Sequence, residues 1–285
     1  MPLKGYLIEK YNLMNGAYTC NRLVEEAVRE GIDLQIKGVS DTQIRPKGIF
    51  NDGKLLETCD FVINRYKWGK LKDSMNSLAA RTYNRIDAFN VYVNKYEQMR
   101  RLSSDAFIKP DYIMGTVLLP YSVIVHTLGT PFVAKGLESS MGEEIYLIEN
   151  EAGYTMLCEK YGRGKDWLFE EFISHSFGRD MRFYSIRGTV LACMQRKSQG
   201  DFRANVALGA SVEPYGITPE IRQIARDIYA QTGLDFLGID LLFGEDKPYF
   251  CEINVMPGLE GIEKASGVNV AHEIIKTIKE DFSHE

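Results

Sequence analysis

The sequence predicts an α/β protein with a largely parallel sheet in its N-terminal part and a strand-rich C-terminal part. Near the start, short apolar segments alternate with segments of helical periodicity, the order that builds parallel sheets. From Asp166 onward, segments rich in β-branched and aromatic residues follow one another closely, as strands do. At 285 residues the chain is long for one core. We therefore expect three units, at residues 1–92, 93–165 and 166–285.

The N-terminal unit has a sequence pattern for each expected element. Residues 18–30 carry Leu23, Val24 and Ala27 at helical spacing and stop before a glycine. Asn51-Asp52-Gly53-Lys54 is typical of a hairpin tip. The predicted strands cover residues 5–9, 34–37 and 60–65, and the predicted helices cover 18–30 and 73–81.

The two later units are predicted in the same way. A helix at 218–232 has Thr218 as its N-cap, Pro219 in its first turn and Gly233 as its stop. Arg187-Gly188 predicts a tight turn. Residues 136–148 read as a small polar loop that enters a strand. The other predicted helices are 95–103, 118–128 and 268–280, and the strands are 112–115, 131–135, 167–173, 180–186, 189–196, 235–243 and 248–253.

Composition excludes several classes of protein. Apolar residues make up 45% and charged residues 26%, which is ordinary for a globular protein. A net charge of -5 argues against broad nucleic-acid binding. No apolar run is long enough for a membrane span or a signal peptide, so we expect a cytoplasmic protein without a membrane partner. The five cysteines and four histidines form neither a Cys-x-x-Cys pair nor a His-Glu-x-x-His motif, which predicts reduced thiols and no zinc hydrolase.

The strongest chemical signal is a set of three oxygen-bearing side chains on two late strands. Glu252 and Asn254 lie two residues apart, so period-two geometry places them on one face of their strand. Asp240 lies on the preceding strand. Such ligands suit Mg²⁺, which takes few carboxylates and completes its shell with phosphate and water oxygens. The alternative is three solvated polar residues, although acids within apolar strands are costly to bury without a cation.

These residues belong to motifs that resemble the RimK-like branch of the ATP-grasp superfamily. The resemblance extends over about residues 83–281 in the expected order, whereas the first 80 or so residues resemble only a generic front domain. It implies an ATP-grasp fold, of α/β (α+β) class, with an N-terminal pre-ATP-grasp parallel-sheet domain. The motifs are Glu171-Phe-Ile, Gly178-Arg-Asp180-Met-Arg182, Asp201-Phe-Arg203-Ala-Asn205, Gly238-Ile-Asp240-Leu-Leu and Glu252-Ile-Asn254-Val-Met-Pro-Gly258.

The resemblance also assigns roles to particular residues. Asp240, Glu252 and Asn254 match the family's metal ligands. Arg182, Arg196 and Arg203 are the predicted catalytic residues, which would hold a carboxylate, an acylphosphate or the transferred phosphate. The predicted nucleotide-binding residues lie on a helix, a strand, a lid, a hinge and two later segments: Lys95, Lys135, Ser140, Met141, Gly142, Glu170, Glu171, Phe172, Ile173, Asp180, Arg203 and Asn205.

Several of these residues have plainer alternatives when taken singly. Lys135 could be a surface lysine, Arg182 the solvent face of a strand, Asp180 a strand cap and Phe172 a core residue. The lid also departs from the family, whose lids are richer in glycine. Here Glu138, Glu143 and Glu144 lie where phosphates are expected to pass, and like charges there disfavour nucleotide unless the side chains point outward.

The resemblance implies an ATP-dependent carboxylate–amine ligase that works through an acylphosphate. Its cofactors would be ATP and Mg²⁺, with two ions expected and Mn²⁺ as an alternative. Its partners would be small carboxylate and amine substrates, with an amino acid such as glutamate as one of them, or a peptide or protein C-terminus. A homo-oligomer stays open. The alternatives are a ligase of another metabolite or peptide pathway, and an ATP-binding module without catalysis.

Overall fold

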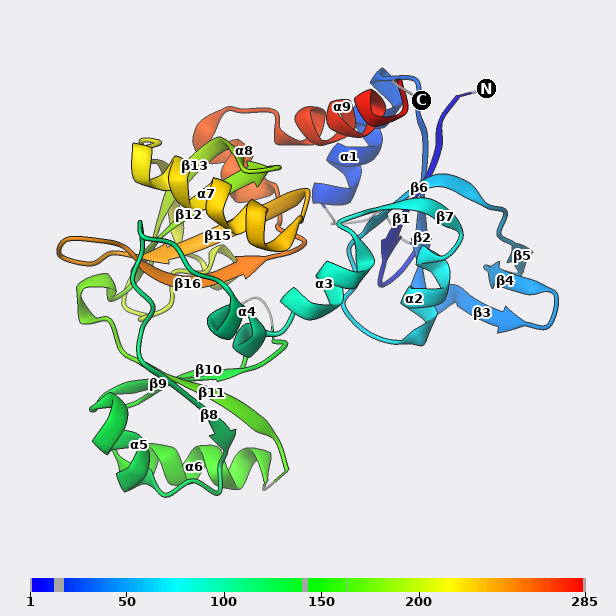
Figure 1. The fold of residues 1–285 in the computed structure, drawn as a ribbon. Helices are drawn as coiled ribbons and strands as arrows, with labels where there is room; N and C mark the ends of the chain where they lie inside the picture. The colour runs from blue at the N-terminus through cyan, green and yellow to red at the C-terminus, as the bar shows by residue number, and fades with distance from the viewer. Residues whose placement is uncertain (1, 13–17, 140–142, 163, 284–285) are drawn as a thin grey trace.

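The computed structural model describes residues 2–12, 18–139, 143–162 and 164–283. In this part of the chain the strands form four sheets, and the small sheet of β3, β4 and β5, at residues 42–55, is inserted in the sequence between two strands of the first one (Figure 1). A parallel sheet and a small hairpin sheet come first, and two antiparallel sheets come after them. The predicted α/β class and the N-terminal parallel sheet are confirmed.

The N-terminal sheet has the strand order β2-β1-β6-β7, and every neighbouring pair is parallel. In the small hairpin sheet, the chain turns at Asp52-Gly53, where both residues have positive φ, as this type of two-residue turn requires. The elements are β1 Lys4–Glu9, α1 Tyr18–Arg29, β2 Asp33–Gly38, the 3-10 turn η1 Val39–Asp41, β3 Thr42–Arg45, β4 Gly48–Asn51, β5 Lys54–Leu55, β6 Cys59–Asn64, α2 Lys70–Asn76, β7 Ala79–Tyr83 and α3 Ile86–Tyr92.

The predicted helix at 73–81 is wrong in extent. Helix α2 ends at Asn76, and the alanine-containing segment after it forms β7, which pairs with β6. Ala79 and Ala80 favour a helix intrinsically, but a helix propensity of a few tenths of a kcal/mol per residue is easily overridden by pairing at a sheet edge.

The central sheet has the order β10-β9-β11-β8 and is antiparallel throughout. Helices α5 and α6 lie together against it (Figure 1), over a core that includes Phe132, Trp167 and Phe169. Helix α6 was not predicted, because its apolar residues follow no clear helical spacing and it contains Gly153. The elements are α4 Lys95–Arg101, β8 Tyr112–Thr116, α5 Tyr121–Leu128, β9 Phe132–Gly136, β10 Ile145–Ile148, α6 Glu151–Tyr161 and β11 Asp166–Glu171.

The C-terminal sheet has five strands in the order β14-β13-β12-β15-β16. Helix α7 begins and ends as predicted, since Thr218 accepts a hydrogen bond from the Ile221 amide and Gly233 closes the last turn in a left-handed conformation. The elements are η2 Ser174–Ser176, β12 Arg179–Ile186, β13 Thr189–Lys197, η3 Val206–Leu208, β14 Ser211–Pro214, α7 Pro219–Thr232, β15 Phe236–Leu242, β16 Tyr249–Asn254, α8 Glu260–Ser266 and α9 Val270–Ser283.

The cores show which parts of the chain pack together. One cluster joins α1 and β6 to β12 and to α9, which lies beside α1 (Figure 1). The central sheet forms a core with its own two helices on one face, while Leu168 of β11 packs into the core of the C-terminal sheet. The boundaries at 92/93 and 165/166 stay predictions, but β11, which begins at Asp166, pairs within the central sheet. None of the helices in the described ranges has the length and apolar character needed to cross a membrane.

Candidate active site

The three predicted metal ligands lie on adjacent strands. Asp240 on β15 is directly opposite Glu252 on β16, and Asn254 is opposite Gly238. Glu252 and Asn254 line the same cavity, as their two-residue spacing predicted. The side chain of Asn254 accepts a hydrogen bond from the Met256 amide at 3.1 Å, which fixes its orientation.

Asp240 differs from its two neighbours, because arginines neutralise it. Arg182 Nε lies 2.6 Å from Asp240 Oδ1, and Arg196 Nη2 lies 2.8 Å from Oδ2. Arg196 also binds Asp180 through two bonds of 2.6 Å. Burial alone would raise the pKa of Asp240, but the two guanidinium groups outweigh it and hold the pKa below its ordinary value. The predicted solvent-facing alternative for Arg182 does not hold, since this side chain is largely buried.

The donor set can be tested against Mg²⁺, the metal that the resemblance in sequence implies. Among the described residues, no group of three or more His, Cys, Asp and Glu side chains is arranged to hold a metal ion. Glu252 and Asn254 supply one carboxylate and one amide oxygen. Mg²⁺ is commonly bound by one or two carboxylates, with waters and substrate phosphates as its other ligands. The residues present therefore fit Mg²⁺ bound together with a nucleotide.

Glu252 remains anionic although it is enclosed. Burial favours its neutral form, but Lys95, Lys135 and Arg182 together hold the pKa of Glu252 below its ordinary value, against the opposing charge of Asp240. Lys95 Nζ lies 3.4 Å from Glu252 Oε2. An ionised Glu252 is the form that a cation requires.

A second cavity lies between the central sheet and the C-terminal sheet. Lys135 on β9 forms a buried ion pair with Glu170 on β11, at 2.6 Å from Nζ to Oε2, so it is no surface lysine. Apolar walls come from Val133, Ile145 and Leu242. This cavity, which we call the rear cavity, collects most of the predicted nucleotide residues. Those that line it are Lys135, Glu170, Glu171, Phe172, Ile173, Asp180, Arg203 and Asn205, together with Arg196, Asp240 and Glu252.

The other predicted nucleotide-binding residues are Lys95 and three residues of the lid. Lys95 faces the front of the site, where its ammonium donates to the Ser139 carbonyl at 2.7 Å. Ser140, Met141 and Gly142 lie outside the described residues. Of the lid acids, Glu138 and Glu143 are exposed, and Glu144 forms an ion pair with Lys165. These acids therefore point outward or are neutralised.

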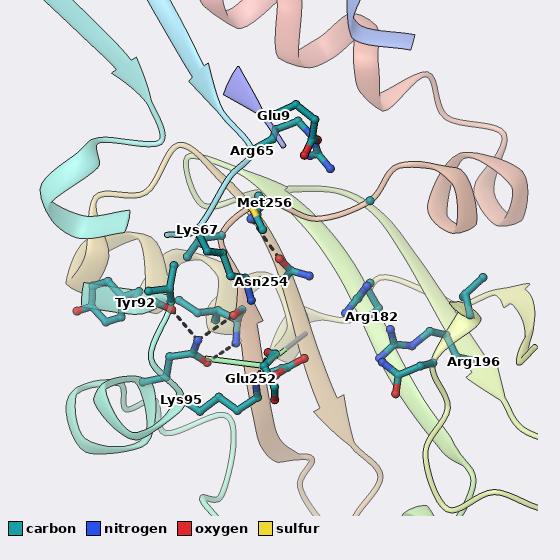
Figure 2. A pocket seen from close by; sticks show the side chains of 18 residues that line it. Glu9, Arg65, Lys67, Tyr92, Lys95, Arg182, Arg196, Glu252, Asn254 and Met256 are labelled. Carbon is teal, nitrogen blue, oxygen red and sulfur yellow. Dashed lines mark hydrogen bonds and ion pairs between the residues drawn. The ribbon is translucent and has the colours of Figure 1, made fainter. Parts of the chain in front are cut away.

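The front cavity, shown in Figure 2, has a volume of about 320 Å³ and shares lining residues with the rear cavity. Sequence reasoning missed three of its charged residues, Glu9, Arg65 and Lys67, which come from the N-terminal unit. Their position just at or after the ends of parallel strands is the signal that could have found them, because ligands of such sheets bind there. Three residues line both cavities, and they are Arg196, Asn205 and Glu252.

Known proteins resemble this chain in both fold and sequence. The structure of the ATP-grasp ligase PsnB with its minimal precursor aligns with a TM-score of 0.71 over 97% of this chain and 98% of that one, at 16% identity. D-alanine–D-alanine ligase from Bacillus anthracis, solved with ATP, aligns with a TM-score of 0.70 over 98% and 96% of the two chains, at 13% identity. The fold is that of ATP-grasp ligases.

The sequence comparison is more specific than the fold. A "Probable alpha-L-glutamate ligase" of Thioalkalivibrio sulfidiphilus (strain HL-EbGR7) is 30% identical over 282 residues, which cover 93% of this chain and 92% of that protein. One of the same name from Methanococcoides burtonii is 31% identical, over 92% and 91% of the two chains. The family model of the RimK-like ATP-grasp domain matches residues 120–278. The chain belongs to the RimK-like ATP-grasp family, and it is an ATP-dependent ligase that forms carbon–nitrogen bonds.

Proposed function

We propose that the protein joins an amino acid such as L-glutamate, through its amine, to the carboxylate of a peptide, protein or small-molecule acceptor. The relatives' names favour glutamate. The observation that carries the proposal is the pair of adjoining cavities with Arg196, Asn205 and Glu252 in their shared wall. A nucleotide in the rear cavity would present its terminal phosphate at that wall, and an acid in the front cavity would meet it there.

The residues of the rear cavity would divide the work of holding ATP. The segment from Glu170 to Ile173 would hold the adenine, with Phe172 and the apolar walls against its ring. Asp180 would lie at the ribose and Lys135 at the phosphates. Arg203 and Asn205 would approach the transferred phosphate.

Glu252 and Asn254, with Asp240 beside them, would hold Mg²⁺ against the phosphates. Two Mg²⁺ ions would bind there, and Mn²⁺ could replace them. The metal, when bound, would offset negative charge on the phosphate oxygens. Lys95, 3.4 Å from Glu252, would add a fixed positive charge at the same place.

The chemistry follows from the poor reactivity of a carboxylate. A carboxylate oxygen of the acceptor attacks the terminal phosphorus of ATP, the bond to the bridging oxygen breaks, and ADP leaves. The amine then attacks the acyl carbon of the acylphosphate, phosphate departs with the bonding electrons, and the nitrogen loses a proton. Arg182 and Arg196 would stabilise the negative charge that builds up on the acyl and phosphoryl oxygens.

The test is a screen of acid and amine substrates with purified protein, ATP and Mg²⁺. ADP release is measured, and products are identified by mass spectrometry. We expect ADP release that requires both an acceptor carboxylate and an amino acid, with a product heavier than the acceptor by one amino-acid residue. An acceptor that loses one water without a second substrate would instead indicate internal ligation within a peptide. Nucleotide binding without ADP release from any mixture would contradict the proposal and favour a non-catalytic module.

A further inference from the structure

The front cavity contains charged groups that the handling of ATP does not use. Glu9 is the last residue of β1, and Arg65 and Lys67 follow β6, its parallel neighbour. Figure 2 shows Glu9 and Arg65 together at one end of the cavity and Lys67 between them and Lys95. They come from the N-terminal unit, none of whose described residues lines the rear cavity, so they are suited to a second substrate.

Charge pairing singles out Lys67 among the cations of this cavity. Lys95 lies near Glu252, Arg182 binds Asp240, and Arg196 binds Asp180 and Asp240. Within the described residues, Lys67 forms no ion pair, and the hydrogen bond found for its ammonium is to the Glu138 carbonyl at 3.4 Å. A partly buried cation without a counter-ion is costly, so the cavity favours an incoming anion.

The pKa of Lys67 reflects the cost of burying this cation. Burial and, to a smaller extent, the nearby charge of Lys95 lower the pKa of Lys67 to about 8, against the opposing effects of Glu252 and Glu138. A bound carboxylate would supply the missing partner and keep the ammonium charged.

Glu9 and Arg65 form a loose pair beside it. Arg65 Nε lies 3.7 Å from Glu9 Oε2, which is too long for a hydrogen bond. This nitrogen is buried and, among the described residues, has no hydrogen-bond partner, while Nη1 donates to the Pro257 carbonyl at 3.1 Å. An acid and a base held at this separation match the two charges of an α-amino acid, with the ammonium group near Glu9 and the α-carboxylate near Arg65.

We infer that Glu9, Arg65 and Lys67 form the subsite for the amine substrate and select an α-amino acid with an acidic side chain, whose second carboxylate binds Lys67. This inference rests on the proposed function and assigns its amine-binding residues. Glutamate and aspartate carry this charge pattern, whereas glutamine has nearly the same shape as glutamate and lacks the second charge.

The test measures amino-acid binding directly, so it needs no acceptor. Calorimetric titrations use L-glutamate, L-aspartate and L-glutamine on protein saturated with Mg²⁺ and a non-hydrolysable ATP analogue. The variants are Lys67→Met, Lys67→Arg, and the control Lys70→Met, which removes an exposed lysine three residues away. Circular dichroism and thermal melts establish that each variant is folded.

We expect the unaltered protein to bind at least one of the two acidic amino acids more tightly than glutamine. Lys67→Met should weaken binding of that acid about tenfold or more and leave glutamine binding unchanged. Lys67→Arg should retain the preference, and Lys70→Met should behave as the unaltered protein. A Lys67→Met protein that binds acidic amino acids normally, or an unaltered protein that binds neither of them, would overturn the inference.

The substrate screen separates this failure from failure of the proposed function. Ligation of acidic amino acids at normal rates in Lys67→Met would leave the ligase activity standing and remove the subsite. Absence of ADP release from every substrate mixture would contradict the ligase proposal itself, while the binding titrations would still judge the subsite.

Discussion

Replacing Lys135 by methionine should have two separate effects. It should destabilise the central sheet, because a buried ion pair is broken, and it should remove nucleotide binding, because the ammonium proposed to contact the phosphates is lost. Lys135 is 6% exposed and its partner Glu170 is 2% exposed. Their contact is 2.6 Å long, and Glu170 Oε1 has no hydrogen-bond partner among the described residues that could take over. Breaking one side of a buried ion pair costs about 3–5 kcal/mol, because the other charge is left without compensation.

A double variant distinguishes the charge effect from packing. Lys135→Met with Glu170→Gln removes both charges at similar volume, so it should recover most of the lost stability. Nucleotide binding should stay absent, because the ammonium that is proposed to reach the phosphates is missing in both variants.

Urea unfolding followed by tryptophan fluorescence is the appropriate assay. Trp167 is fully buried in the core of the same sheet and pairs with Gly136, next to Lys135, whereas the other tryptophan, Trp68, is exposed. Nucleotide binding is titrated calorimetrically in parallel. A single variant as stable as the unaltered protein would refute the buried-pair argument, and a double variant that binds ATP normally would remove Lys135 from the phosphate site.

Three further predictions concern the metal site, the amine subsite and a helix end. Glu252→Gln and Asn254→Ala should each lower turnover about 100-fold or more with near-normal melting temperatures, and normal ADP release in both would discard the metal assignment. The KM for L-glutamate should rise as the pH increases from about 7 to about 9, because Lys67, with its pKa of about 8, loses its charge, and Lys67→Arg should flatten this profile. Thr218→Ala should cost about 1 kcal/mol of stability in urea unfolding, since Thr218 caps α7, and an unchanged midpoint would contradict that role.

Asp240 is left out of these substitutions for a structural reason. Its carboxylate balances Arg182 and Arg196, so an Asp240 variant would leave two buried arginines with fewer partners. Such a protein could lose activity through misfolding alone. Glu252 and Asn254 are the better test because fewer charged side chains depend on them.

Local pattern predicted those parts of the site that lie on single strands. The two-residue spacing of Glu252 and Asn254 was enough to place both on one cavity. The arginine pair around Asp240 could not be predicted in the same way, because it depends on how β12, β13 and β15 align across the sheet. Glu9 and Lys67 were missed because they reach the site from a different unit, where the sequence resembles only a generic front domain.

The same limit explains the errors in the fold. The segment from Ala79 to Tyr83 becomes a strand through pairing with β6, which no local signal in its own residues reveals. Helix α7 was predicted at both ends because its cap, its proline and its terminal glycine are all local.

The arrangement of the cores determines how the ligase can open. Helix α9 packs against α1. Its Asp281 accepts a hydrogen bond from Tyr83 of β7 and forms an ion pair with Arg187, so these contacts join the N-terminal and C-terminal units. The central sheet packs against its own two helices, contacts the C-terminal core mainly through Leu168, and supplies one wall of the rear cavity. We therefore expect ATP to enter as the central sheet and its helices rotate away from the other two sheets, while the residues proposed to bind the amine stay in place.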